Sequence, residues 1–423
     1  MINISKIFIK IDNLFKNKKI LLLICLLLLS FQLCYSFLYP THGPRGKAWL
    51  SLPDLISHEK SPLDASEGLL ITKAYGLLSN YYINADGGQY LLLANNFPNY
   101  YIGNNPVILD RPFYSFLIAV IAFLPRLFFD SYATLFASAI FLNFILGFFS
   151  VVLFYYLCEK LISSRVALLS SLLLIFSPYF HFWLVQPVPN IFTIFIIVAT
   201  LVLLEKYIKN PSSLKLIVFS LIIGVFMLGK MIFAMPIFIL FSAFYFKRYK
   251  EGIIFLIIHL IPLIFWYLFV VTKLGIPYYI NEADYGVGVW LLDAFHSPWY
   301  KTFEIFLSVL PQFVYVVIYA FLLIPVIFSI FGFKKLIFKI GHFFALNFIL
   351  SFLILLFIMN LYSPRYGFFL YPIVYPSAVL GIDQIAEFFK KYKNWYSAVF
   401  YLVVFIFLIV ISNADIYKIF PYG

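Results

Sequence analysis

Residues 133–157 read ATLFASAIFLNFILGFFSVVLFYYL and contain no charged side chain. A helix of this length and composition crosses the hydrocarbon core of a bilayer, which is about 30 Å thick. Similar apolar runs recur along the whole chain, and only 11% of the 423 residues are charged, against about a quarter in soluble domains. The runs lack the alternation that a membrane β-barrel requires. The sequence therefore predicts an all-α, polytopic membrane protein.

Small groups of basic residues separate the apolar runs, and such groups set the orientation of a membrane protein. The candidate spans lie at about 20–38, 113–129, 133–157, 166–184, 191–207, 214–228, 231–246, 253–271, 303–330, 341–360, 366–386 and 395–414. The basic groups between them are Lys160/Arg165, Lys206/Lys209/Lys215, Lys247/Arg248/Lys250, Lys334/Lys335/Lys339 and Lys390/Lys391/Lys393. All of these groups fall on the side of the lysine-rich N-terminus only if 113–129 does not cross.

We therefore predict about eleven transmembrane helices, a cytoplasmic N-terminus and a location in the cytoplasmic membrane. The run at 113–129 becomes a juxtamembrane or shallow re-entrant helix. Residues 1–423 form one membrane domain, with a folded first outer loop at 39–132 that carries juxtamembrane helices and a second outer loop at 272–302. We expect any active chemistry to face outside.

The net charge of +12 is spread over small groups rather than gathered in one patch, so nucleic acid is not an expected partner. The cysteines lie in or at the ends of spans and imply neither a disulfide framework nor a metal site; they are Cys25, Cys34 and Cys158.

The stretch NADGGQY at 84–90 stands out in the first outer loop, because polar residues in so apolar a chain mark functional sites. Asp86 precedes Tyr90 and an apolar segment, so we expect the acid to open a helix whose apolar face lies on the membrane. A carboxylate at a helix N-terminus is stabilised in its charged form. Asp86 is either a helix cap without chemistry or a catalytic base at the membrane surface, and its context favours the base.

Three cations of the outer side are candidates for binding a phosphate. Arg111 follows Asp110, so its guanidinium either binds a phosphate through its planar fork or pairs with that acid. Lys230 stands in a tight turn between two spans, where it is either a snorkelling anchor or a phosphate contact. Arg365 lies directly before Tyr366 at the mouth of a late span, a suitable place to hold a lipid-linked phosphate.

In their order along the chain, these short motifs resemble those of the GT-C superfamily of polytopic glycosyltransferases, which includes protein O-mannosyltransferases and the aminoarabinose transferase of lipid A. The motifs cover about residues 20–385 and are Asp86 with Tyr90, Arg111-Pro112 before an apolar helix, Ser177-Pro178, Gly229-Lys230 and Arg365-Tyr366. The resemblance implies an inverting transfer of a sugar from a polyprenyl-phosphate donor to a glycan, lipid or protein acceptor. It implies Asp86 as the base, with Arg365, Lys230 and Arg111 at the donor phosphate. Substrate contacts would come from Tyr90, Asp110, Asn190 and Tyr366.

One position departs from the family pattern. Many relatives carry an acidic residue after the third span that helps to bind a metal, and here that place holds Asn190. An amide carbonyl coordinates a cation more weakly than a carboxylate does. The sequence therefore gives no certain cofactor, and a tightly held divalent cation becomes doubtful.

Three other functions stay open. A transporter or flippase of lipid-linked sugars would place charges at mid-membrane, and Glu304 in the run at 303–330 is its best support. A polymerase of lipid-linked saccharides would carry its main outer loop late in the chain, whereas the largest loop here is the first. A non-catalytic scaffold for envelope assembly is the third.

Overall fold

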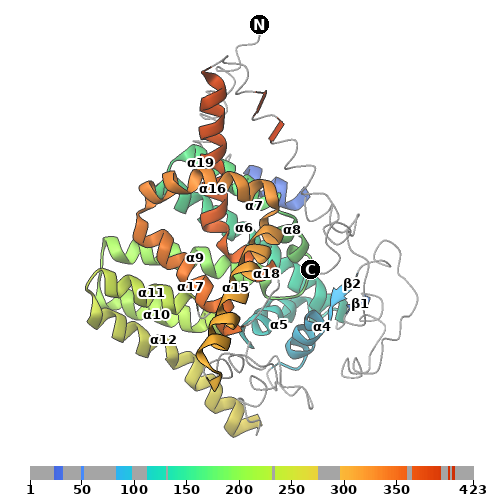
Figure 1. Cartoon of the computed structure of the whole chain (residues 1–423). Coiled ribbons are helices and arrows are strands. Elements are labelled where there is room, and N and C mark those ends of the chain that lie inside the picture. The colour runs from blue at the N-terminus through green and yellow to red at the C-terminus, as the bar shows by residue number, and fades with distance from the viewer. Residues whose placement is uncertain are drawn as a thin grey trace.

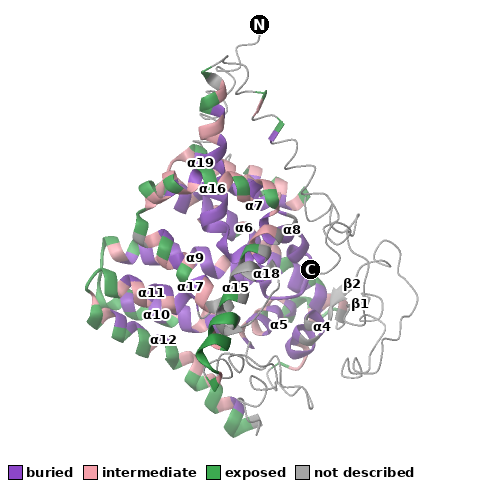
Figure 2. Ribbon diagram, viewed as in Figure 1, coloured by how far each residue is buried: buried purple, intermediate pink, exposed green. Residues whose placement is uncertain are grey.

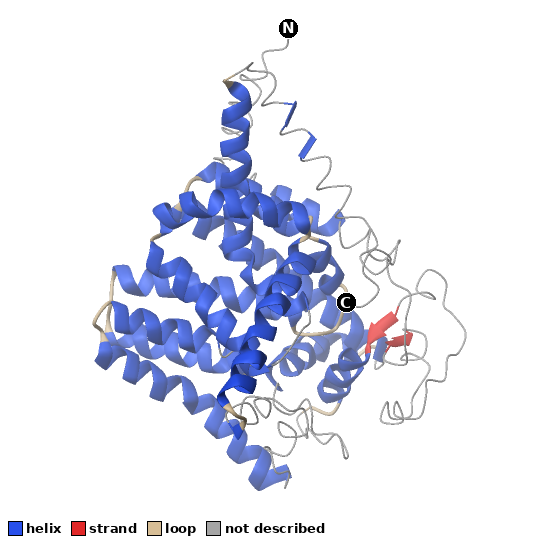
Figure 3. Cartoon of the chain, viewed as in Figure 1, coloured by secondary structure: helices blue, strands red, loops and turns tan. Residues whose placement is uncertain are grey.

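The structure, a computed structural model, describes residues 23–31, 49–51, 82–97, 112–129, 132–230, 234–274, 296–359, 364–391, 399–400 and 403–404. Most of these residues lie in helices, and two short strands form the one sheet within the described ranges (Figure 3). The predicted class, an all-α polytopic membrane protein, is therefore confirmed.

The helices follow the predicted apolar runs. In chain order they are α4 (Ala85–Asn95), α5 (Pro112–Arg126), α6 (Tyr132–Leu161), α7 (Ser164–Ile175), α8 (Pro178–Leu184), α9 (Asn190–Lys209), α10 (Ser213–Met227), α11 (Ala234–Tyr245), α12 (Tyr249–Phe269), α15 (Trp299–Phe321), α16 (Leu323–Ile340), α17 (His342–Met359), α18 (Pro364–Gly367) and α19 (Tyr371–Lys390). Two irregular turns, η3 (Val270–Leu274) and η4 (Phe368–Leu370), continue α12 and lead into α19. A further helical segment at 23–31 lies inside the predicted first span.

Four helical segments of the described ranges are long and apolar enough to cross a bilayer on their own: Ala133–Leu161, Asn190–Lys209, Tyr249–Lys273 and Phe368–Phe389. A fifth results if α16 and α17, which are bent by 119° relative to each other, form one broken span. The helices α5, α7, α10 and α11 are shorter, and at 1.5 Å per residue they reach only about 18–22 Å. The number of about eleven spans therefore stays a prediction.

The run predicted as one span at 303–330 is two helices. α15 ends at Phe321, Leu322 has φ of +65°, and α16 begins at Leu323. A left-handed backbone at a residue other than glycine is uncommon, and it ends the first helix here. Pro325 lies in the first turn of α16, where a missing N–H breaks no helical hydrogen bond.

The centre of the bundle is formed by α6, α9 and α19. Buried positions make up 78% of the apolar window of α9 and 83% of that of α19, against 17% for α12, and Figure 2 shows the same contrast. The Tyr371 hydroxyl donates a hydrogen bond to the Ile194 carbonyl at 2.9 Å, which ties α19 to α9. The helices α10, α11 and α12 lie side by side next to α9 (Figure 1). The exposed apolar face of α12 is therefore the natural lipid-facing surface.

The segment predicted as the first outer loop, 39–132, holds the sheet and two short helices among its described residues. β1 (Trp49–Ser51) pairs antiparallel with β2 (Tyr82–Asn84), and α4 follows β2 directly. The sequence did not predict the sheet, because strands of three residues carry no readable period. It did predict a helix opened by Asp86 and one at 113–129, and α4 and α5 confirm both. Phe128 and Phe129, just past α5, are 79% and 72% exposed, as suits a helix that lies at the membrane surface.

Helices α16 and α19 cross at two glycines. A Cβ at Gly332 would overlap the carbonyl oxygen of Ser377, and a Cβ at Gly381 would overlap that of Phe328. Each glycine therefore faces the backbone of the other helix. Small residues at a crossing let two membrane helices approach to backbone contact.

We expect Gly332→Ala to destabilise the bundle by about 1–3 kcal/mol, because a carbonyl oxygen cannot move aside as a flexible side chain can. Thermal unfolding in detergent measures the effect. Ile330→Ala, two residues away on the exposed side of the same helix, is the control and should change the unfolding temperature little. Equal unfolding temperatures for Gly332→Ala and wild type would contradict the close crossing.

Candidate functional site

Lys230 is a buried cation just beyond the C-terminal end of α10. Its side chain is 6% exposed, and its Nζ donates a hydrogen bond to Asn190 Oδ1 at 2.9 Å. The same Nζ lies 5.8 Å from the centre of the Tyr366 ring, within the range of a cation–π contact. A snorkelling lysine keeps its ammonium in water, whereas this ammonium is enclosed. The structure thus brings together three candidate residues from three distant motifs.

Asn190 reaches this place because a proline-rich connection starts α9 there. The segment Gln186-Pro187-Val188-Pro189 links α8 to α9, and Asn190 is the first residue of α9. Its Oδ1 accepts from Lys230, which identifies the other amide atom as Nδ2. Nδ2 is buried and, among the described residues, has no hydrogen-bond partner. The amide therefore presents a buried donor beside the ammonium.

The turn that carries Lys230 is fixed by two contacts. A Cβ at Gly229 would overlap the Phe192 ring, so only glycine allows this approach to α9. The Phe113 N–H donates to the Leu228 carbonyl at 3.1 Å, which joins the turn to the first residues of α5. The N-terminal ends of α5 and α9 and the end of α10 therefore meet at one point.

The helix opened by Asp86 reaches the same region through Tyr90. The rings of Tyr90 and Tyr114 make an edge contact with centres 5.5 Å apart, and Tyr114 also contacts Phe192 at 6.4 Å. The Tyr114 hydroxyl donates to Asn143 Oδ1 at 2.9 Å. Burial raises the pKa of this hydroxyl well above its usual value, so it stays protonated and remains a donor. A continuous set of contacts thus runs from α4 to the turn of Lys230.

The other candidates lie as follows. Asp86 is the second residue of α4, directly after the paired strand β2, and the backbone alone is described at this position. Arg365 is the second residue of α18, next to Tyr366, and again only its backbone is described. Asp110 and Arg111 lie outside the described residues. Glu304, the support for a transporter, is exposed near the start of α15.

Tyr114, Asn143 and Phe192 were not assigned to the site from the sequence. The sequence could not identify Phe192 as a site residue, because the chain has 53 phenylalanines and most of them lie in apolar runs like this one. Asn143 does carry a signal: it lies in the middle of an apolar run, where a polar side chain is costly and needs partners.

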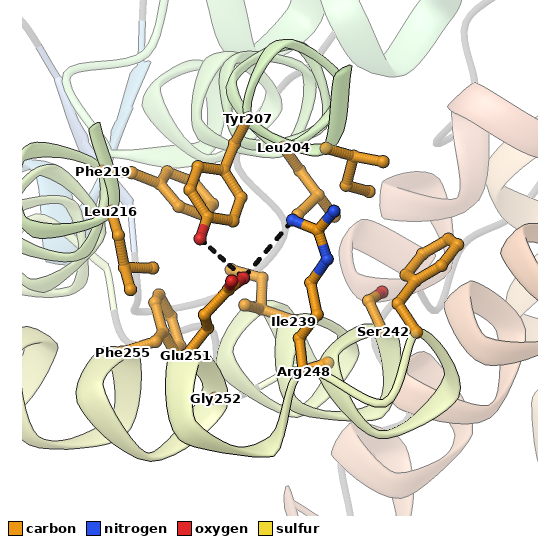
Figure 4. Close-up of a pocket in the computed structure, with 13 residues that line it drawn as sticks. Leu204, Tyr207, Leu216, Phe219, Ile239, Ser242, Arg248, Glu251, Gly252 and Phe255 are labelled. Atoms are coloured by element: carbon orange, nitrogen blue, oxygen red, sulfur yellow. Dashed lines mark hydrogen bonds and ion pairs between the residues drawn. The ribbon is translucent and has the colours of Figure 1, made fainter. Parts of the chain in front are cut away.

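A second polar cluster lies at the opposite end of α9. The Tyr207 hydroxyl donates to Glu251 Oε2 at 2.7 Å, and Arg248 Nη1 reaches the same oxygen at 3.4 Å (Figure 4). These side chains border a mostly apolar cavity of about 30 Å³, which has room for a water molecule but not for a sugar. The cluster fastens α9 to α12 and is separate from the Lys230 region.

The residues around Asn190 do not fit a divalent cation. The oxygen that would coordinate the metal, Asn190 Oδ1, already accepts a hydrogen bond from the Lys230 ammonium at 2.9 Å. A metal ion bound to the same oxygen would lie close to this ammonium, and the two positive charges would repel each other. Within the part of the chain that the structure describes, no three His, Cys, Asp or Glu residues are grouped to hold a metal ion.

Residues 92–272 match the family described as dolichyl-phosphate-mannose-protein mannosyltransferase. The matched segment, less than half of the chain, contains Asn190 and Lys230, whereas Asp86 and Arg365 lie outside it. The match confirms the predicted resemblance to the GT-C superfamily of membrane glycosyltransferases.

Solved structures match as well, among them ArnT and AglB. ArnT from Cupriavidus metallidurans in the apo state is 13% identical with a TM-score of 0.47, and the match covers 72% of this chain and 56% of that one. The archaeal oligosaccharyltransferase AglB from Archaeoglobus fulgidus, in complex with an inhibitory peptide and a dolichol-phosphate, is 13% identical with a TM-score of 0.46. That match covers 79% of this chain and 51% of AglB, so the chain spans a little over half the length of either protein. No curated protein sequence matches.

Proposed function

We propose that this membrane protein is a glycosyltransferase that moves a sugar from a polyprenyl-phosphate donor to a hydroxyl group of a glycan, lipid or protein. We place the reaction at the outer face of the cytoplasmic membrane. The family match supports a glycosyltransferase with a lipid-linked donor. The order of the sequence motifs supports the finer parts of the proposal.

The observation that carries the proposal is the buried pair of Lys230 and Asn190. An ammonium and an adjacent amide N–H are both donors, and a phosphate oxygen accepts from both. The phosphate of the donor is a competent leaving group that needs charge stabilisation more than protonation. Donors fixed in an apolar, enclosed place supply this stabilisation better than water does.

We assign the remaining candidates around this pair. We place Arg365 and Arg111 at the donor phosphate together with Lys230. Arg365 is assigned because it adjoins Tyr366, and Arg111 is assigned from its sequence motif alone. Asn190, Tyr366, Tyr90 and Asp110 are the proposed substrate contacts. No divalent cation is needed in this arrangement, because Lys230 supplies the positive charge.

The proposed reaction is a single displacement. The acceptor oxygen attacks the anomeric carbon while the bond from this carbon to the phosphate oxygen breaks, so the anomeric centre inverts. Asp86 takes the proton of the acceptor hydroxyl, a role that typically contributes about 10²–10⁴-fold. One carboxylate suffices here, whereas a glycoside hydrolase needs a pair at a defined separation.

Transfer of a radiolabelled sugar tests the proposal. Membranes that contain the protein are supplied with polyprenyl-phosphate-linked mannose, the first donor to try in view of the family match, and with envelope material from cells that lack the protein. Label should move from the lipid to the acceptor, and EDTA should not prevent this. A transporter would instead move intact donor across a vesicle membrane. Unchanged donor with mannose, other hexoses and pentoses would overturn the proposal.

The proposed orientation can be tested separately. Ser131→Cys and Ser164→Cys, each in a background with alanine at Cys25, Cys34 and Cys158, are exposed to an impermeant maleimide in intact spheroplasts. We expect labelling at 131, before α6, and none at 164, at the start of α7, because α6 crosses the membrane and the basic groups fix its direction. The reverse pattern would invert the topology and place the Lys230 region on the inner side.

A further inference from the structure

A buried hydrogen-bond relay connects the two halves of the proposed site. Tyr114 on α5 and Asn143 on α6 both have 0% exposed surface. The Tyr114 hydroxyl donates to Asn143 Oδ1 at 2.9 Å, and Asn143 Nδ2 donates to the carbonyls of Gln186 at 2.6 Å and Trp183 at 3.4 Å. The relay therefore joins α5 to the connection that follows α8.

The direction of these bonds is fixed by the groups themselves. A backbone carbonyl can only accept, so the Asn143 atom that faces Gln186 and Trp183 must be the amide nitrogen. The oxygen of the same amide then faces Tyr114, whose hydroxyl must donate. No other assignment satisfies all of these atoms. The hydrogen bonds of the relay therefore have a single arrangement, which fixes the positions of α5, α6 and the α8–α9 connection relative to one another.

Each end of the relay leads to a proposed functional residue. At one end, Ser115 Oγ donates to the Tyr90 carbonyl at 3.0 Å and the Tyr90 ring packs on Tyr114, so α5 holds the helix that Asp86 opens. At the other end, Gln186 begins the proline-rich segment that ends at Asn190, the partner of Lys230. The relay therefore spans from the helix of the proposed base to the proposed phosphate contacts.

We infer that Tyr114 and Asn143 are positioning residues, which set the separation between the helix of Asp86 and the Lys230–Asn190 pair. This inference rests on the proposed function. An in-line displacement needs the base and the leaving-group contacts at a fixed spacing, and a misplacement of about 1 Å can cost about 100-fold in rate. Neither side chain has to touch the substrate for this role.

The first test is Tyr114→Phe. We expect kcat to fall about tenfold or more while KM for the polyprenyl-phosphate sugar stays within about twofold, because the phosphate contacts remain. Backbone amides of α4 should also exchange hydrogen faster, because α5, which holds α4, loses its hydrogen bond to Asn143 on α6. Tyr371→Phe is the matched control: it removes another buried hydrogen bond, at 2.9 Å between α19 and α9, and should lower stability without altering α4 exchange or kcat.

A double variant separates positioning from simple loss of stability. In Tyr114→Phe the Asn143 oxygen is left buried without its donor, whereas Tyr114→Phe with Asn143→Leu removes both groups of that hydrogen bond, a change that is often nearly neutral for stability. The two carbonyls that lose the Asn143 amide still accept from backbone N–H groups, Trp183 from Gln186 and Gln186 from Val188. We expect the double variant to regain thermal stability but not kcat or slow α4 exchange. Recovery of kcat in the double variant, or unchanged α4 exchange in Tyr114→Phe, would overturn the inference. If the wild-type protein transfers no sugar, the proposed function is contradicted. The hydrogen-exchange measurement would still show whether the relay holds α4.

Discussion

Asp86→Asn is expected to reduce sugar transfer by about 10²–10⁴-fold, the usual contribution of a general base. The variant should still fold, insert and bind the donor. Asp86 is the second residue of α4, and α4 begins directly after the paired strand β2. The backbone of Asp86 is therefore held by the helix on one side and by the sheet on the other. Asparagine keeps the size of the side chain and loses only the favourable interaction of a negative charge with the first turn of a helix, so a purely structural Asp86 would lose only about 0.3–1 kcal/mol.

The rate and the stability must therefore be measured together. Transfer of label from polyprenyl-phosphate mannose gives the rate, and thermal unfolding in detergent gives the stability. Acids earlier in the same loop form the control, because Asp64→Asn makes the same chemical change at a position without a proposed role. Wild-type transfer by Asp86→Asn at equal protein levels would remove the proposed base and favour a transporter or scaffold.

The positions of the helices could largely be predicted from the sequence, because an apolar run must form a helix to cross a membrane. The breaks between consecutive helices were harder to predict. The run predicted as one span at 166–184 is two helices, α7 and α8. Pro178 is the first residue of α8, a position where proline is favoured, but Ser177-Pro178 was interpreted only as a motif. The break at Leu322 was missed, because residues 316–328 on either side of it include no charged or amide side chain that would indicate a helix end. Pro325 was the only readable signal there, and proline at the first helical position would place the helix start two residues after the observed start at Leu323.

The site was predictable as single residues but not as an arrangement. Lys230, Asn190 and Tyr366 were each identified from a short motif, and nothing in a sequence states that a lysine will meet an asparagine 40 positions earlier. Their contact depends on Gly229, whose missing side chain lets the turn approach Phe192. The relay through Asn143 was missed, although a polar residue within an apolar span is itself a sign of a buried partner.

Lys230→Met should lower kcat/KM for the lipid-linked donor by about 10²–10³-fold, the cost of removing one fixed electrostatic contact from a developing charge. Methionine is close to lysine in length and fills the same apolar surroundings. The effect on stability is expected to be small, because removal of the costly buried charge offsets the lost hydrogen bond to Asn190. Activity should thus fall far more than the unfolding temperature.

Two further variants make this result specific. Lys230→Arg keeps the charge but should recover only part of the activity, because the turn is fixed against Phe192 and the larger, planar guanidinium cannot adopt the position of the ammonium. Lys215→Met is the matched control: Lys215 is exposed near the other end of α10, where its Nζ bonds the Asn210 carbonyl at 3.0 Å. It should transfer sugar like the wild type. Equal kcat/KM for Lys230→Met and Lys215→Met would exclude Lys230 from the donor phosphate, because an ammonium buried in that position could then have only a structural role.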